Sequence, residues 1–230
     1  MSLGKRLVVP FIVIAALSVG ACATTQVDRK QATEQKARDV SGDVWATNNQ
    51  IDATMMALNN MMSADGPQLQ QAFDRYAAEV DRLKKQSEVI SKDGAFMRTE
   101  GDAYLSAWQK QNNDIQNQDL RDNSEQGRKT VKDRTQSVQG SYDTARTSLD
   151  RLLRNLEDVR TALRNDLTSR GVTGVSQTNV VQRSQQNAEE AKNNLRQVQS
   201  DSASLAEALS PSAPPVATTD TASDGTNQYH

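Results

Sequence analysis

The sequence is short of the residue types on which most catalytic and metal sites depend. Its 230 residues include one cysteine, Cys22, and one histidine, His230. A single cysteine excludes a disulfide framework or a thiolate metal site within one chain. A single histidine at the last position excludes a Ser–His–Asp triad and a multi-histidine metal site. There is also no P-loop or dinucleotide-binding fingerprint. We therefore predict a protein that is not an enzyme and that has no metal and no cofactor.

Aromatic residues, prolines and net charge are low as well. Aromatic residues make up 4% of the chain and hydrophobic residues 36%, which is little for a globule but enough for helices with a narrow apolar stripe. Two of the five prolines lie before residue 68 and three after residue 210, so residues 68–210 contain none. Lysine and arginine total 27 against 29 acidic residues. Because nucleic-acid binding needs a basic surface, we expect no nucleic-acid partner.

The N-terminal residues have the layout of a secretory signal peptide. Residues 5–6 are basic, residues 7–19 are apolar, and residues 20–21 are small. The uncharged stretch is shorter than the ~20 residues that span a bilayer as a helix. We predict a signal peptide over residues 1–21. Removing it takes away two of the 27 basic residues and no acid, which leaves 25 against 29 and a net charge of −4.

The four residues Val19-Gly20-Ala21-Cys22 resemble the lipobox of bacterial lipoproteins. The resemblance implies cleavage between Ala21 and Cys22 and acylation of Cys22, for example with palmitate. Several acyl chains would hold the protein stably at a membrane. Ala23 is not the Asp that keeps many such lipoproteins at the inner membrane, so the resemblance implies the periplasmic face of the outer membrane. The alternative is an ordinary signal peptide, cut near Ala21 or Ala23, that leaves a free thiol.

Apolar residues recur at alternating steps of three and four through four segments of the chain. The clearest such seam is Leu69, Phe73, Tyr76, Val80, Leu83, Ser87, Ile90, Gly94, Met97, Gly101, Tyr104 and Trp108. This alternation is typical of helices packed as left-handed coiled coils. We predict an all-α fold, an elongated antiparallel bundle of about four helices. The predicted helices are residues 28–62, 67–116, 118–168 and 176–209.

The segments between these helices contain helix-ending and helix-capping residues. Residues 63–67 contain Gly and Pro, residues 169–175 contain two glycines, and Asn117 can cap the third helix. We expect Ser176 or Thr178 to cap the fourth helix. Residues 22–27 are predicted to be a lipid-anchored linker. From residue 210 the chain is rich in Pro, Ala, Ser and Thr, which predicts a disordered tail over residues 210–230.

Short connections make neighbouring helices antiparallel, so the loops 63–67 and 169–175 should lie together, far from Cys22. These loops are the predicted partner-binding region. Its candidate residues are Asp65, Gly66, Arg170, Gly171 and Gly174.

Gly94 and Gly101 occupy seam positions, where glycine costs about 1 kcal/mol relative to alanine. Either another helix approaches closely there or the bundle bends, or the weakness is simply tolerated. The aromatic residues on the seams are expected to be core residues. Trp45 lies slightly off the first seam; we expect it to pack at the bundle edge, with an exposed contact as the alternative.

Two further stretches resemble a known family. They are Gly101-Asp102-Ala103-Tyr104-Leu105-Ser106-Ala107-Trp108 and Leu120-Arg121-Asp122-Asn123-Ser124-Glu125. They are similar to an uncharacterised family of helical envelope proteins of Gram-negative bacteria, known only as a domain of unknown function. The resemblance implies an extended coiled-coil fold and assigns no activity.

The sequence thus favours a membrane-anchored, non-catalytic scaffold or adaptor with an envelope protein partner. Self-association and a regulatory role stay open. The alternative is a small-molecule or lipid carrier that uses a bundle cavity near Gly94 and Gly101.

Overall fold

The computed structural model describes the backbone of residues 20–210 and the side chains of residues 27–210. The helices in this range are α1 (Gly20–Met62), α2 (Leu69–Asn113), α3 (Gln118–Asn165), α4 (Ser169–Ser176) and α5 (Val180–Leu209), with a 3-10 turn η1 (Gly66–Gln68) before α2. Most of the predicted signal peptide and nearly all of the predicted tail lie outside the described residues.

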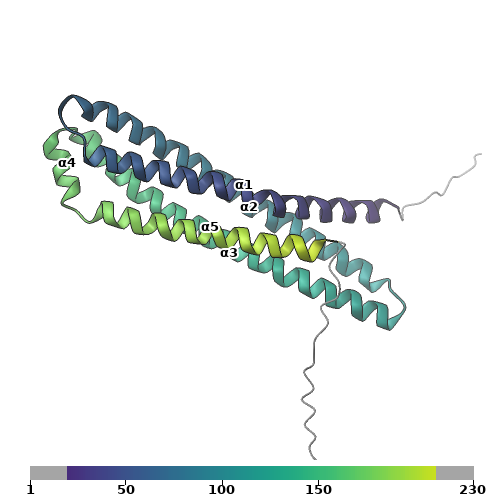
Figure 1. The fold of residues 1–230 in the computed structure, drawn as a ribbon. Helices are drawn as coiled ribbons and strands as arrows, with labels where there is room; N and C mark the ends of the chain where they lie inside the picture. Colours follow the sequence, from purple (N-terminus) through teal and green to yellow (C-terminus); the bar gives the residue numbers. More distant parts are fainter. Residues whose placement is uncertain (1–19, 211–230) are drawn as a thin grey trace, which may run out of the picture.

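The long helices α1, α2, α3 and α5 form one elongated antiparallel bundle (Figure 1). α1 packs against α2 and α5, and α3 also packs against α2 and α5, so the helices surround a single core. The predicted all-α antiparallel bundle is confirmed. At 1.5 Å per residue, the 45 residues of α2 and the 48 residues of α3 make each of these helices on the order of 70 Å long.

The predicted seams form the core. Leu83, Ile90, Leu149 and Leu195 are each fully buried. Tyr76 is buried too, and its hydroxyl donates a hydrogen bond of 2.6 Å to the carbonyl oxygen of Leu156. The core runs the length of the bundle as a thin column, because each helix contributes only the residues of one seam.

Both seam glycines mark a close approach between α2 and α3. A Cβ atom on Gly94 would lie 3.1 Å from the Cβ atom of Tyr142, and a Cβ atom on Gly101 would lie 2.8 Å from Cγ2 of Thr135. Both distances are shorter than ordinary van der Waals contact. Of the interpretations that the sequence leaves open, close helix approach is therefore the one that the structure supports.

Polar contacts fix the register of α1 against α2. Three of them are Arg29–Glu100 at 3.0 Å, Lys36–Asp93 at 2.6 Å and Gln50–Glu79 at 2.9 Å. Successive contacts are seven and fourteen residues apart in both helices, which are whole heptads. The two helices therefore keep one antiparallel register over at least 22 residues of α1.

Several predicted helix boundaries were wrong. α1 begins at Gly20 rather than at residue 28, so it includes the predicted linker 22–27. Residues 169–175 are not a loop, since α4 spans them. Thr168 accepts a hydrogen bond from the backbone N–H of Gly171 and caps α4, while Val172 and Val175, one turn apart, are buried. These interactions offset the low helix propensity of the two glycines.

Other boundary predictions were closer. Asn117 caps α3 as predicted, because its side chain accepts a hydrogen bond from the backbone N–H of Leu120. α2 ends at Asn113 rather than 116, and α3 ends at Asn165 rather than 168. α5 begins at Val180 after Asn179, and the Thr178 hydroxyl accepts a hydrogen bond from the backbone N–H of Val180.

The close approach at Gly101 predicts an unusual response to alanine. In Gly101→Ala, the new methyl group meets Thr135, and overpacking of about 1–3 kcal/mol exceeds the gain of about 1 kcal/mol in helix propensity. We expect a lower free energy of unfolding in urea titrations followed by circular dichroism. Adding Thr135→Ser removes the methyl group in the way and should restore stability.

Gly140→Ala is the matched control, because a Cβ there would meet no described atom within 4 Å apart from its own helix. It should stabilise α3 by about 1 kcal/mol. If Gly101→Ala stabilised the protein equally, the tight contact would be disproved.

Candidate functional site

The predicted partner-binding residues lie at one end of the bundle, which we call the distal cap and define as residues 63–68 and 166–179. α1 and α4 contact each other there, and the Ser176 hydroxyl lies 3.6 Å from the sulfur of Met62. Figure 1 shows α4 beside the α1–α2 turn, at the end of the bundle away from the start of α1. The structure therefore brings the two predicted segments together, although they are about 100 residues apart in the chain.

In the first segment of the distal cap, the turn geometry explains the Gly-Pro sequence. Gly66 has a φ of +46°, a left-handed conformation that favours glycine. Pro67 follows within η1, where its missing N–H costs little. Asp65 and Gly66 are both exposed, so this turn presents its polar backbone and the Asp65 carboxylate to solvent.

In the second segment, Arg170 and Gly174 are exposed and Gly171 is half-buried. A Cβ atom on Gly171 would collide with the carbonyl oxygen of Asp166, which leaves no room for a side chain. Gly171 therefore allows the chain to fold back from α3 into α4. Gly171 therefore has a structural role in the distal cap. Arg170 is the charged group that α4 presents to solvent.

A second exposed feature lies on the outer face of α1. Trp45 and Met56 are 69% and 61% exposed, so the expected packing of Trp45 at the bundle edge was wrong. Near Met56 is an open surface pocket of about 260 Å³ between α1 and α2. Its lining residues are Asn49, Asp52, Ala53, Met56, Ala57, Asn60, Arg75 and Glu79.

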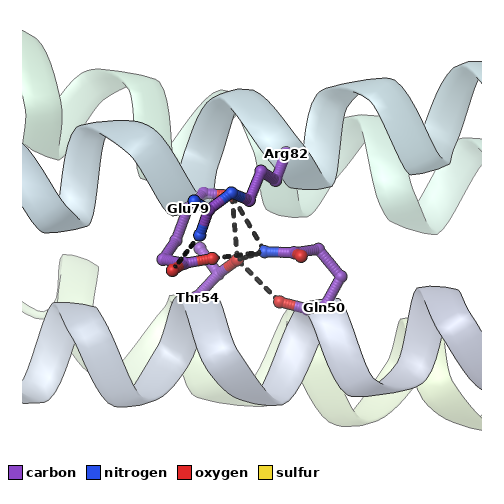
Figure 2. A network of polar contacts seen from close by, with 4 residues as sticks. All are labelled: Gln50, Thr54, Glu79 and Arg82. Carbon is purple, nitrogen blue, oxygen red and sulfur yellow. Dashed lines mark hydrogen bonds and ion pairs between the residues drawn. The ribbon is translucent and has the colours of Figure 1, made fainter.

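A polar network beside this pocket links α1 to α2 (Figure 2). The Gln50 amide donates hydrogen bonds to the backbone carbonyl and the carboxylate of Glu79, at 3.2 and 2.9 Å. Arg82 lies 2.6 Å from the other carboxylate oxygen. The hydrogen bond from Gln50, aided by Arg82, outweighs burial and holds the pKa of Glu79 below its ordinary value. Both oxygens of the Glu79 carboxylate are thus satisfied, one by Gln50 of α1 and the other by Arg82 of α2. The network therefore holds α1 against α2.

Next to Gly94 lies a buried polar group, the waist cluster, made of Lys36, Asp43, Asp93 and Tyr142. The Lys36 ammonium lies 2.6 Å from Asp93 and 3.2 Å from Asp43. Asp93 is only 6% exposed and Tyr142 only 3%. One carboxylate oxygen of Asp93 and the hydroxyl of Tyr142 find no hydrogen-bond partner among the residues that the structure describes.

Burial controls the protonation of the waist cluster. It raises the pKa of Asp93 above its ordinary value, and the ion pair with Lys36 opposes this without cancelling it, while Asp43 adds to the rise. Burial also lowers the pKa of Lys36, but the two carboxylates outweigh that effect and raise it. Burial, followed by the charges of Asp93 and Asp43, raises the pKa of the Tyr142 phenol. The ionised form of Asp93 is therefore less stable, relative to the protonated form, in this fold than in water.

Sequence reasoning missed the waist cluster and the Gln50–Glu79 network. Lys36, Asp43, Asp93 and Glu79 look like ordinary charged residues of a solvated helix face. One feature of the sequence pointed to this cluster, namely that Asp93 directly precedes the seam residue Gly94. The missing side chain of Gly94 makes room for the Tyr142 ring.

Other types of site find little support in residues 20–210. This part of the chain holds no group of three or more His, Cys, Asp or Glu side chains that could bind a metal ion. None of its helices combines the length and the apolar character needed to cross a membrane. Gly94 and Gly101 line neither the pocket beside Met56 nor a second surface pocket over residues 185–194, and Tyr142 and Thr135 occupy the space over them.

The chain belongs to the family described as "Protein of unknown function (DUF2959)", which matches residues 25–209. The match covers the whole described bundle apart from its first few residues, and it confirms the resemblance to a domain of unknown function. No curated protein and no solved structure matches the chain.

The waist cluster predicts a pH-dependent effect of Asp93→Asn. The raised pKa of Asp93 means that its ionised form costs stability, and that this cost disappears as the pH falls through the raised pKa towards the ordinary value of 3.8. The variant should therefore melt at the same temperature or higher at pH 7, and its advantage should shrink towards pH 4. Thermal melts at several pH values measure this.

Two controls accompany Asp93→Asn. Lys36→Met leaves the carboxylates without their counter-charge and should cost about 2 kcal/mol at pH 7, less than for a fully buried pair because Lys36 is partly solvated. Asp158→Asn, at an exposed position of α3, should change stability by less than about 0.5 kcal/mol. A clear loss of stability in Asp93→Asn at pH 7 would show that the ion pair outweighs burial.

Proposed function

We propose that this DUF2959 protein is a lipoprotein of the outer membrane that faces the periplasm. In this proposal acyl groups on Cys22, exposed by cleavage after Ala21, hold the protein at the membrane. The bundle has a non-catalytic role and uses its distal cap to bind another protein of the envelope. The lipobox-like residues 19–22 support the anchor, and the position of the distal cap supports the binding role.

The observation that carries this proposal is the course of α1. The helix runs without a break from Gly20, two residues before Cys22, to Met62, directly before the distal cap. Its 43 residues correspond to about 60 Å. An anchor at one end of this helix would hold the exposed residues Asp65 and Arg170 at a distance from the membrane, where a partner can reach them.

The bundle suits an adaptor better than a carrier. A carrier needs an enclosed apolar space, and ligand pockets are typically several hundred cubic ångströms. The place predicted for that space, beside Gly94 and Gly101, is filled by Tyr142 and Thr135. The pocket beside Met56 is open and is lined mainly by polar residues and alanines.

The anchor predicts the behaviour of Cys22→Ala. Wild-type protein expressed in a Gram-negative host should incorporate radiolabelled palmitate and sediment with outer-membrane fractions. The variant lacks the thiol that carries the acyl group, so it should lose the label and leave the outer-membrane fraction. An unlabelled wild-type chain, or a variant that still sediments with outer-membrane fractions, would contradict the anchor.

The binding role predicts crosslinks from the distal cap. A photoreactive residue at position 65 or 170 should give, in intact cells, the same crosslinked product with a different envelope protein. Arg170→Glu should weaken the product formed from position 65. Position 154, exposed on the side of α3, is the control and should not give this product. Crosslinks only between copies of this chain would contradict a different partner.

A further inference from the structure

The hairpin of α2 and α3 extends beyond the other two long helices at the end opposite the distal cap. Contacts between α5 and α1 include Lys192–Asp52 at 2.8 Å and Gln199–Ser41 at 3.2 Å. α5 ends at Leu209, ten residues after Gln199. Because Gln199 lies beside Ser41 and the two helices are antiparallel, the end of α5 lies level with about residue 31 of α1. In Figure 1 the hairpin continues past the end of α5.

The register between α1 and α2 locates Cys22 relative to this hairpin. Arg29 lies opposite Glu100, and the same spacing holds at the two earlier contacts along these helices. Cys22 is seven residues before Arg29, still within α1, and so corresponds to Ala107, seven residues after Glu100. Because α2 continues to Asn113, the hairpin reaches about 10 Å beyond the level of Cys22 along the bundle axis.

An acylated Cys22 therefore brings the end of the hairpin to the membrane. The polar headgroup layer is about 5–7 Å thick on each side of the hydrocarbon core. With the bundle axis near the membrane normal and Cys22 just outside the headgroups, a segment about 10 Å beyond the anchor residue reaches into this layer. Keeping the hairpin out of the headgroups would require the bundle to tilt strongly or the start of α1 to unwind.

The end of the hairpin has a surface that suits headgroups rather than the hydrocarbon core. Leu120, in the first turn of α3, is 62% exposed. Around it are exposed polar residues that can hydrogen-bond to headgroups, namely Asn113, Asp114, Gln116, Asn117, Gln118 and Asp119. Leu120 is the one large apolar side chain exposed in this segment, so the segment has little apolar surface to insert and would meet the headgroups mainly through polar contacts.

The hairpin end is also held in shape. Arg121 donates a hydrogen bond of 3.0 Å from Nε to the carbonyl oxygen of Ile115 and so closes the turn. Trp108 donates a hydrogen bond of 3.0 Å from its indole nitrogen to the hydroxyl of Ser124, which joins α2 to α3. The segment can therefore meet a surface without first having to fold.

We propose that residues 113–121, the hairpin tip, form a second contact of this protein with the lipid headgroups of the membrane that holds acylated Cys22. The inference rests on the proposed lipid anchor. Two contacts about one helix diameter or more apart restrict the tilt of the bundle, which a single acylated residue cannot do. The lipid contact thereby orients the distal cap away from the membrane.

The test uses the full acylated protein in vesicles of phosphatidylethanolamine and phosphatidylglycerol. Acylation consumes the thiol of Cys22, so a new cysteine can be labelled selectively with an environment-sensitive NBD fluorophore. The probe position is Leu120→Cys, and the control is Met56→Cys, which has nearly the same exposure, 61% against 62%, but lies towards the distal cap. Lipids that carry a spin label on the headgroup serve as the quencher.

We expect the headgroup spin label to quench the fluorophore at position 120 and to leave the one at position 56 unchanged. Mass spectrometry of the N-terminal peptide and vesicle flotation establish acylation and attachment independently. An acylated, vesicle-bound chain with no quenching at position 120 would overturn the hairpin contact and leave the anchor intact. A chain without acyl groups on Cys22 would overturn the anchor and this inference together.

Discussion

The structure depends on the burial of one narrow seam on each long helix. A seam of about two residues per heptad hides little apolar surface per turn, so stability has to come from length. This accounts for helices α2 and α3 of 45 and 48 residues and for a core with few aromatic rings. It also accounts for the tight contacts at Gly94 and Gly101, where Tyr142 and Thr135 of α3 lie directly against the two glycines of α2.

Polar contacts between α1 and α2 give these helices a unique register, which a uniform apolar seam does not provide. Apolar seams with a heptad repeat can slide by one heptad at modest cost, whereas a shifted ion pair or amide contact leaves buried polar groups unpaired. Lys36–Asp93 and Gln50–Glu79 lie fourteen residues apart in both helices and become satisfied together in one alignment. In the waist cluster, one oxygen of Asp93 and the hydroxyl of Tyr142 still have no hydrogen-bond partner among the described residues, which lowers the stability of the fold.

The fold could be predicted from the sequence because the seams repeat over many heptads and their breaks contain Gly, Pro and Asn117. The position of the distal cap followed from the same antiparallel connections. α4 could not be predicted in this way, because Gly171 and Gly174 have low helix propensity and the interactions that offset it, the Thr168 cap and the burial of Val172 and Val175, depend on tertiary structure. The waist cluster was missed for a similar reason, since a buried aspartate and an exposed one have the same letter in the sequence.

The unbroken course of α1 has a mechanical consequence. Because α1 is stiffened by two neighbouring helices and contains no kink-forming proline, the bundle moves as one stiff lever. With a lever arm of about 60 Å, a rotation of roughly 10° displaces the distal cap sideways by about 10 Å. Under the proposed membrane anchor, small changes in tilt would thus be amplified into large sideways movements of the distal cap.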